Sequence, residues 1–322
     1  MNSVDEQGHQ VPAVGSGLPP ELASLGDRLG ILEDQTLLVS RLSGGLTNAN
    51  FKIQTTKGCF VVRVSSPSST LLAIDRANER YNTIAAAETG VGAAVVEYLD
   101  DPNVLVVDYI DGKTLSAADL AGGTLLDRIA QACLRLHSAR PFASDFNMFE
   151  IQRRYLSIVK ARGFYLPERY LDFADSIADM ERAFEINKER QVPCNNDLLA
   201  ENFIDDGNQI RIIDYEYSGN NEPSFEIGNI WSESNLSLEQ LGELCQAYYG
   251  RFDQAIVARA RLWGLMSKYG WTLWASIQAS VAEIEFDFLS WGAEKFDRAV
   301  AEFNSADFPR LLANLASSTG GH

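Results

Sequence analysis

The stretch that decides the fold is Asn195-Asn196-Asp197-Leu198-Leu199-Ala200-Glu201-Asn202. Asp197 and Asn202 lie five positions apart, and Asp214 follows at the end of the apolar run 209–213. Asn and Asp favour loops, whereas the apolar run favours a strand. The segment therefore gathers two carboxylates and an amide around one loop and one strand.

This spacing is the one at which phosphoryl-transfer enzymes hold a hydroxyl and a metal-bound nucleotide. Asp197 would accept the proton of the attacking hydroxyl, and Asn202 would bind Mg²⁺ through its amide oxygen. Asp214 would bridge the metal ions that neutralise the phosphates of ATP. The alternative is an Asx-rich turn followed by a hairpin, because Asn and Asp also make local hydrogen bonds in loops. The order of the motifs along the chain favours phosphoryl transfer.

A glycine-containing turn over residues 43–48 is the first candidate for phosphate binding. Gly44 and Gly45 have no Cβ, so backbone N–H groups at this turn can approach phosphate oxygens closely. Thr47 and Asn48 complete the turn, and we assign these four residues to the nucleotide. An ordinary hairpin turn is the alternative for this segment taken by itself.

Arg63 lies inside the apolar strand 60–64, where its charge must point to solvent or meet a carboxylate and a phosphate. Glu79, on the next expected helix, is the natural carboxylate. Kinases use such a pair of strand cation and helix acid to orient phosphates, normally with Lys, and Arg offers a permanent charge and a wider fork. The alternative is an Arg exposed on the open face of the strand.

The apolar pattern predicts an α+β protein with a small antiparallel β-rich lobe and a larger, mostly helical lobe. Strands are expected over 36–41, 50–55, 59–64, 94–98 and 104–110, with one helix over 74–89. Further helices are expected over 125–138, 149–160, 171–186, 238–249 and 254–304.

Three parts of the chain follow from this order of elements. We expect a flexible tail over 1–22, a nucleotide-binding lobe over 23–110, and a helical lobe with the catalytic loop and acceptor site over 111–322. The join near 108–112 would form a cleft, which makes Asp108 and Ile110 candidates for contacts with the nucleotide.

Composition excludes several classes of function. The net charge of −17 argues against binding of a nucleic-acid backbone. The four cysteines are far apart and match neither a disulfide framework nor a zinc site, which predicts a reducing, cytoplasmic location. We expect no membrane span and no signal peptide.

His137 is the only histidine in an expected folded segment, at a helix end where capping or packing is its expected role.

The chain resembles the choline and ethanolamine kinases, which belong to the aminoglycoside-phosphotransferase superfamily. The resemblance covers about residues 38–303. Its carriers are segments 44–48, 61–64, 196–199, 202–204, 213–220, 225–229 and 271–274. It implies a protein-kinase-like bilobal fold, ATP and Mg²⁺ as cofactors, and a small cationic substrate that bears a hydroxyl. It also allows a homodimer.

Tryptophans are candidates for the acceptor site. Trp271 and Trp274 share a helix face at i and i+3, and Trp291 could close a cage around an ammonium group through cation–π attraction. The alternative is a packed aromatic core between helices. The resemblance places Glu226 and Glu233 near the substrate, with Glu226 standing where the family usually has Asp. Glu216, within segment 213–220, joins this acceptor set.

One residue departs from the family pattern: Asn195 stands where His commonly precedes the Asn-Asp pair. An amide could replace the structural role of that His; if it does not, the loop would be misplaced. We expect an Mg²⁺-ATP-dependent kinase that acts on the hydroxyl of choline, ethanolamine or a similar amino alcohol. The alternatives are a phosphotransferase acting on another hydroxylated amine, such as an aminoglycoside, and a nucleotide-binding pseudokinase without turnover.

Overall fold

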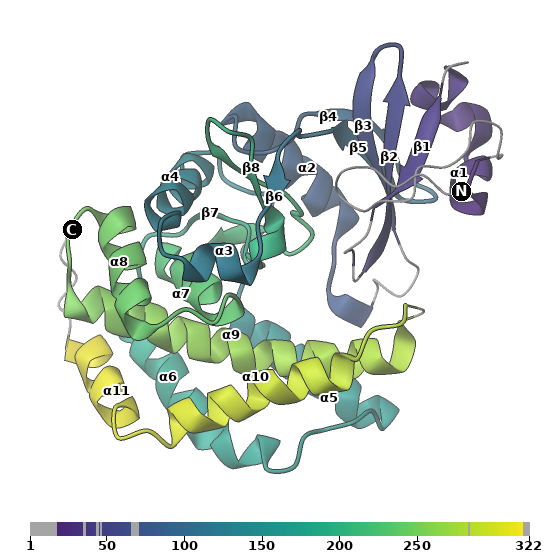
Figure 1. Cartoon of the computed structure of the whole chain (residues 1–322). Coiled ribbons are helices and arrows are strands. Elements are labelled where there is room, and N and C mark those ends of the chain that lie inside the picture. Colours follow the sequence, from purple (N-terminus) through teal and green to yellow (C-terminus); the bar gives the residue numbers. More distant parts are fainter. Residues whose placement is uncertain are drawn as a thin grey trace. The chain divides into compact units, whose positions relative to one another are not determined.

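The computed structural model describes residues 18–34, 37–42, 45, 47–65, 71–282 and 284–317. The chain divides into two compact units, which are described one at a time (Figure 1). The first unit takes its residues from 1–69 and 93–111, and the second from 70–92 and 112–322. The segment 70–92 thus groups with the second unit, whereas the sequence pattern assigns it to the lobe over 23–110.

The first unit is built on a five-stranded antiparallel sheet with the order β1-β2-β3-β5-β4. Its strands are β1 (Leu38–Arg41), β2 (Asn48–Thr55), β3 (Gly58–Ser65), β4 (Val95–Leu99) and β5 (Val104–Asp108). Apolar residues recur at every second position of β2 and β3, which buries one row of side chains, including Phe51 and Val62. The expected antiparallel sheet is therefore present.

Short helical turns before β1 complete the core of this unit. They are α1 (Pro20–Ala23), η1 (Gly26–Arg28) and η2 (Gly30–Glu33). Leu22, Leu25 and Leu29 from these turns are buried against the sheet residues. The expectation of a flexible tail as far as residue 22 is therefore wrong at its C-terminal end, because burial of Leu22 orders α1; residues 1–17 lie outside the described part of the chain.

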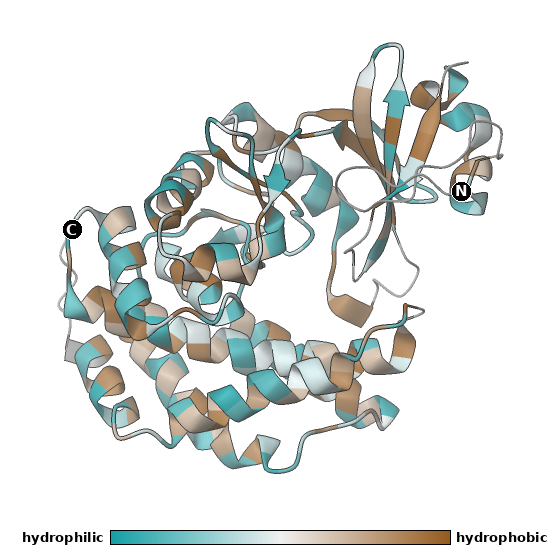
Figure 2. Ribbon diagram, in the orientation of Figure 1, coloured by the Kyte–Doolittle hydropathy of each residue, from teal (hydrophilic) through white to brown (hydrophobic). Residues whose placement is uncertain are grey.

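The second unit is mostly helical. Its helices are α2 (Arg76–Glu88), α3 (Ala117–Ala121), α4 (Leu126–His137), α5 (Met148–Arg162), η4 (Tyr170–Phe173), α6 (Ala174–Ile186), η5 (Ala200–Asn202), α7 (Pro223–Glu233), α8 (Leu238–Tyr249), α9 (Gln254–Val281), α10 (Phe288–Phe303) and α11 (Phe308–Ser317). Hydrophobic and hydrophilic residues alternate in bands along these helices, as expected where one face is buried (Figure 2). Among the residues described, no helix is both long and apolar enough to cross a membrane.

A pair of short strands and a small three-stranded sheet interrupt the helices and carry the loop 195–202. β7 (Val192–Cys194) pairs with β10 (Gly219–Asn221). β8 (Phe203–Asp205) pairs with both β6 (Lys113–Thr114) and β9 (Ile210–Ile212). The loop 195–202 is therefore anchored by a strand at its start and by η5 and β8 at its end.

The expected helix over 254–304 is two helices. α9 ends at Val281, and α10 begins after Asp287, whose side chain accepts a hydrogen bond from the backbone N–H of Ser290. Such a cap satisfies a helix donor that would otherwise lack a partner. The two helices run side by side in Figure 1. This arrangement brings Trp271 and Trp274 of α9 next to residues of α10.

Helices α7 and α9 pack with unusually close backbones. A Cβ at Gly228 would come within 2.1 Å of the carbonyl oxygen of Ala260, and a Cβ at Gly264 would come within 2.6 Å of the carbonyl oxygen of Gly228. Only glycine fits at such a crossing. The close approach fixes α7, which carries Glu226 and Glu233.

Candidate active site

The side chain of Glu226 holds the backbone at the start of the loop 195–202. Its carboxylate accepts one hydrogen bond from the backbone N–H of Asn195 and one from that of Asn196, each at 2.8 Å. Glu226 is fully buried on α7. Both oxygens thus bind the loop backbone, which is a positioning contact; the expected contact of Glu226 with the substrate stays a prediction.

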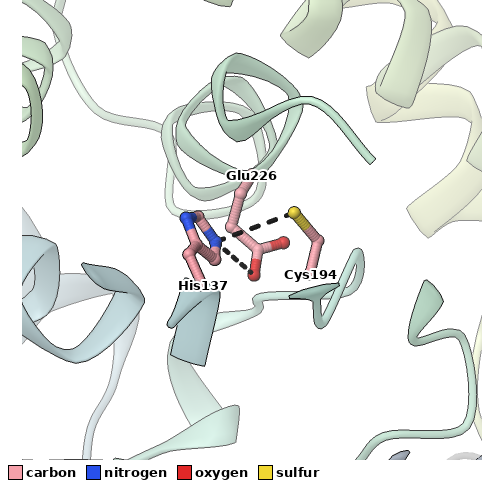
Figure 3. Close-up of side chains that lie close together, drawn as sticks. All are labelled: His137, Cys194 and Glu226. Carbon is pink, nitrogen blue, oxygen red and sulfur yellow. Dashed lines mark hydrogen bonds and ion pairs between the residues drawn. The ribbon is translucent and has the colours of Figure 1, made fainter. Parts of the chain in front are cut away.

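Three buried side chains of different chemistry meet beneath the loop (Figure 3). His137 ends α4, Cys194 ends β7, and Glu226 lies on α7. The Nε2 atom of His137 lies 3.7 Å from the Cys194 sulfur and 3.7 Å from the Glu226 Oε1, while its Nδ1 lies 2.7 Å from the hydroxyl of Tyr248.

These residue types are able to bind a metal ion, but their surroundings favour another role. Burial, and then the charge of Glu226, raise the pKa of the Cys194 thiol well above its usual value. The protein therefore favours the neutral thiol, whereas metal ions bind the thiolate. Glu226 is already occupied by two backbone donors. We interpret the cluster as packing that supports the loop, in line with the expected packing role of His137.

Asn195 links the two halves of the site. Its Nδ2 donates to the carbonyl oxygens of Ile213 at 3.1 Å and Asp214 at 2.8 Å, and its Oδ1 accepts from the backbone N–H of Asp197 at 3.1 Å. Asp214 has a positive φ of 62°, a conformation that Asp tolerates better than most residues. The amide therefore connects the loop to the segment after β9, which answers the structural question raised by the absence of a His.

The predicted catalytic and metal-binding residues lie together. Nδ2 of Asn202 donates to the carbonyl oxygen of Asp197 at 2.7 Å, and the carbonyl oxygen of Asn202 accepts from the N–H of Ile213 at 3.0 Å. Because Asn202 uses its amide nitrogen on the loop, its amide oxygen is the atom that would bind a cation. Asp197, Asn202 and Asp214 thus converge through the loop and the end of β9.

The electrostatics around Asp197 favour a cation. Burial raises the pKa of Asp197 well above its usual value, and the charges of Glu233, Asp214 and Glu216 raise it further, while Lys295 opposes them. Several carboxylates near one another repel unless a cation lies between them. This acidic setting, with an amide oxygen beside it, fits the oxygen ligands that Mg²⁺ prefers.

Arg76 on α2 is a residue of this site that the sequence pattern did not reveal. Its guanidinium lies 2.7 Å from Glu79 and 3.2 Å from Glu216. Glu79, which the sequence analysis pairs with Arg63, therefore has an ion pair on its own helix. The Arg63 pairing would join the two units and stays a prediction. The spacing Arg76-x-x-Glu79 could have pointed to the pair, because residues three apart share a helix face.

The predicted nucleotide residues other than Glu79 belong to the first unit, and Gly44 lies outside the described residues. Gly45 has little room: a Cβ there would lie 2.8 Å from the carbonyl oxygen of Asn48. Arg63 lies in the middle of β3, opposite Leu105 of β5. Thr47 lies just before β2, and Asn48 is the first residue of β2. Asp108 is the last residue of β5, and Ile110 follows two residues later.

The predicted acceptor tryptophans form one cluster, which we call the tryptophan cluster (Trp271, Trp274 and Trp291). The rings of Trp274 and Trp291 are 5.5 Å apart. Tyr217 joins the cluster: its hydroxyl accepts a hydrogen bond from Nε1 of Trp274 at 2.8 Å, and its ring lies edge-on to Trp271 at 4.9 Å. Burial raises the pKa of Tyr217, with contributions from Tyr155, Glu216 and Asp197. The carbonyl oxygen of Tyr217 accepts a hydrogen bond from Nδ2 of Asn196 at 3.1 Å, so this tyrosine connects the cluster to the catalytic loop.

Glu233 lies at the C-terminal end of α7 and forms an ion pair with Lys295 of α10. Lys295 also lies over the ring of Trp291, with its ammonium nitrogen 3.9 Å from the ring centroid. The sequence analysis did not identify Lys295, although its position four residues after Trp291 is a helical neighbour position. Glu233 thus pairs with a lysine that contacts Trp291 of the tryptophan cluster, and its expected place near the substrate stays a prediction.

A cavity of about 230 Å³ lies beside Tyr217 in the second unit. Its charged lining residues are Asp75, Asp145, Glu150, Arg154 and Glu216. Of the predicted acceptor residues, only Glu216 lines it. The cavity is therefore a neighbour of the tryptophan cluster and does not coincide with it.

Comparison with known proteins identifies the family. The model of the choline/ethanolamine kinase family matches residues 39–242. The chain belongs to this family. It is accordingly a small-molecule phosphotransferase.

Relatives and a solved structure agree with this assignment. The chain is similar to Protein LicA of Haemophilus influenzae, with 27% identity over 267 residues that cover 80% of this chain and 77% of the relative. It is similar to Ethanolamine kinase 2 of Rattus norvegicus, with 27% identity covering 80% of this chain and 74% of the relative. A choline/ethanolamine kinase family protein from Mesorhizobium loti superimposes with a TM-score of 0.80 at 29% identity, covering 92% of this chain and 98% of that one. The expected kinase-like α+β fold is confirmed.

Proposed function

We propose that this phosphotransferase moves the γ-phosphate of Mg²⁺-ATP to the hydroxyl of choline, ethanolamine or a similar amino alcohol. The observation that carries the proposal is the convergence of Asp197, Asn202 and Asp214. Asn195 is hydrogen-bonded to both Asp197 and Asp214, and Asn202 is hydrogen-bonded to Asp197. The tryptophan cluster is connected to the same loop through Tyr217, which bonds to Trp274 by its hydroxyl and to Asn196 by its carbonyl oxygen, so a cation bound there would lie near the reacting hydroxyl.

Each residue of the loop has a distinct role in this proposal. Asp197 orients the acceptor hydroxyl and accepts its proton. Asn202 and Asp214 hold Mg²⁺, which supplies charge neutralisation at the phosphates when bound. Glu226 and Asn195 hold the loop in place through their hydrogen bonds and are positioning residues.

The nucleotide is assigned to the turn and strands of the first unit. We propose that Gly44, Gly45, Thr47 and Asn48 approach the phosphates through their backbone, and that Arg63 pairs with them by charge. Glu79 would orient Arg63, and Asp108 and Ile110 would contact the rest of the nucleotide. The crowding of a Cβ at Gly45 supports this assignment, because a tight turn brings successive backbone N–H groups close together.

The acceptor's ammonium is assigned to the tryptophan cluster with Glu233 and Glu216. Aromatic faces attract a cation, by roughly 1–2 kcal/mol for each desolvated contact, and carboxylates add to this attraction. Glu226 is left out of this set because both of its oxygens bind the loop.

A coupled assay of ADP release tests the proposal over choline, ethanolamine, related amino alcohols and several aminoglycosides. We expect turnover of at least one amino alcohol that requires Mg²⁺. Turnover of aminoglycosides alone would replace the proposed acceptor. A thermal shift with Mg²⁺-ATP but no ADP release from any acceptor would contradict enzymatic function in this form.

Replacing Asp197 with Asn tests the assigned base. We expect loss of ADP release with an unchanged or higher melting temperature, because the change removes a carboxylate that its neighbours repel. The matched control is Asp127→Asn, the same change at an exposed position on α4, which should keep full activity. Turnover at the wild-type rate in the Asp197 variant would exclude the assigned role.

A further inference from the structure

Lys295 is an internal cation at the site assigned to the acceptor's ammonium. Its Nζ forms an ion pair with Oε2 of Glu233, and the side chains of Lys295 and Glu233 are only 8% and 1% exposed. The same Nζ lies 3.9 Å from the ring centroid of Trp291. A carboxylate and an indole face are the two groups that would receive an ammonium ion from outside, and here both contact the ammonium of a lysine.

This pair lies close to the chemistry. The charges of Glu233 and Lys295 act on Asp197 in opposite directions, which places both within electrostatic reach of the catalytic carboxylate. Contacts also link the pair to the loop: the ring of Trp291 lies 5.5 Å from that of Trp274, Nε1 of Trp274 donates to the hydroxyl of Tyr217, and the carbonyl oxygen of Tyr217 accepts from Nδ2 of Asn196. We therefore expect a substrate whose hydroxyl reaches Asp197 to bring its ammonium group near Lys295. Like charges repel, so an incoming ammonium ion competes with Lys295 for Glu233.

The second oxygen of Glu233 shows what kind of ammonium can compete. Oε1 of Glu233 is buried and accepts no hydrogen bond from any of the residues that the structure describes. A buried oxygen without a donor is unfavourable, and an N–H group from a ligand would satisfy it. A primary, secondary or tertiary ammonium ion has such a donor, whereas a quaternary ammonium ion has none.

We propose that Glu233 and Lys295 make this site select acceptors whose ammonium group carries N–H donors, such as ethanolamine, over quaternary acceptors, such as choline. Lys295 is the specificity-determining residue. An N–H-bearing ammonium can donate to Oε1, or replace the hydrogen bond that Lys295 makes to Oε2, and so keeps Glu233 satisfied. A quaternary ammonium that displaces Lys295 leaves the carboxylate without any donor, so only its charge and its contact with the indoles remain. The inference rests on the proposed function, since it concerns the acceptor of the same site.

Binding of methylated ammonium ions to the unmodified protein tests the inference without catalysis. The probes are methylammonium, dimethylammonium, trimethylammonium and tetramethylammonium, followed by tryptophan fluorescence because the site contains Trp291. We expect a sharp break at the last step: tetramethylammonium, which has no N–H, should bind roughly tenfold more weakly than trimethylammonium, the value of one charge-assisted hydrogen bond. Equal or tighter binding of tetramethylammonium would overturn the inference.

Replacing Lys295 with Gln tests the residue itself. Gln keeps a donor for Glu233 but removes the competing charge, so the ratio of kcat/KM for ethanolamine to that for choline should fall at least about fivefold. The matched control is Lys113→Gln, which removes an exposed lysine paired with Asp119 and should leave the ratio unchanged. An unchanged ratio in the Lys295 variant would overturn the role of Lys295.

Two further outcomes separate this inference from the proposed function. If no amino alcohol is turned over, the proposed function fails, while the methylammonium series still reports on the cation site. If the Lys295→Gln protein does not fold, methylammonium should restore its folding, because an external ammonium ion with N–H donors can replace both the missing charge and the missing hydrogen bond beside Glu233. Failure of that rescue would count against Lys295 as an occupant of a cation site and indicate a purely structural ion pair.

Discussion

Replacing Glu226 with Gln separates two roles that the residue could have. In the structure both carboxylate oxygens accept backbone hydrogen bonds at 2.8 Å, from Asn195 and Asn196, and the side chain is fully buried. Gln is nearly the same size, so the change alters hydrogen bonding and charge with little effect on packing. It retains one acceptor oxygen, and its NH₂ group then faces a backbone N–H, donor against donor.

The magnitude follows from these two contacts. One charge-assisted bond becomes neutral, and the other is replaced by an unsatisfied buried donor, which together should lower the free energy of unfolding by about 2–4 kcal/mol. The loop that carries Asp197 loses part of its support, and a shift of about 1 Å in a reacting group can cost on the order of 100-fold in rate. We therefore expect kcat to fall at least about tenfold while KM for the acceptor changes less than about twofold.

Urea titration and steady-state kinetics measure both quantities. Glu294→Gln, the same substitution at an exposed position of α10, is the control and should change neither stability nor rate. If Glu226 bound the acceptor directly, its replacement would leave the free energy of unfolding unchanged and raise KM. That result would refute the reasoning that assigns Glu226 to the loop.

Three further outcomes follow from the site. Asn195→Ala should lower kcat at least about tenfold, measured by ADP release, because the side-chain hydrogen bonds of Asn195 to Ile213, Asp214 and Asp197 are lost. Trp274→Phe should raise KM for the amino alcohol roughly threefold, since it removes indole area and the hydrogen bond to Tyr217; an unchanged KM would point to a packing role only. The raised pKa of Asp197 should place the acid limb of the kcat/KM profile at a higher pH than that of an ordinary aspartate, because activity rises as the base ionises. By linkage, the free energy of unfolding should fall as the pH rises from the usual aspartate pKa to the raised one. Asp197→Asn should abolish that fall.

The fold was predictable where the local pattern is strong. Alternating apolar residues predict β2 and β3, and amphipathic spacing predicts α4 and α8, whose expected and observed bounds differ by one residue or less. Helix α7 was not predicted: nearly all of its residues are buried, so it lacks the polar face that identifies a helix in sequence.

The site was predictable to a similar degree. The spacing of Asp197, Asn202 and Asp214 predicts one loop, and the structure brings them together. The pairing of Lys295 with Glu233 and that of Arg76 with Glu216 could not be found in this way, because the partners are far apart in sequence. Such contacts depend on tertiary packing, which leaves no local pattern.

Asn195 has a consequence for how this enzyme responds to its surroundings. Imidazole changes its charge between pH 5 and 8, whereas an amide does not titrate there. A loop fastened to Asp214 by an amide keeps the same hydrogen bonds over that whole range. It also offers no target at that position to reagents that acylate histidine, and His137, buried under the loop, is shielded from them. The part of the anchoring that Asn195 provides is thus indifferent to a change of pH between 5 and 8 and to histidine-directed chemistry.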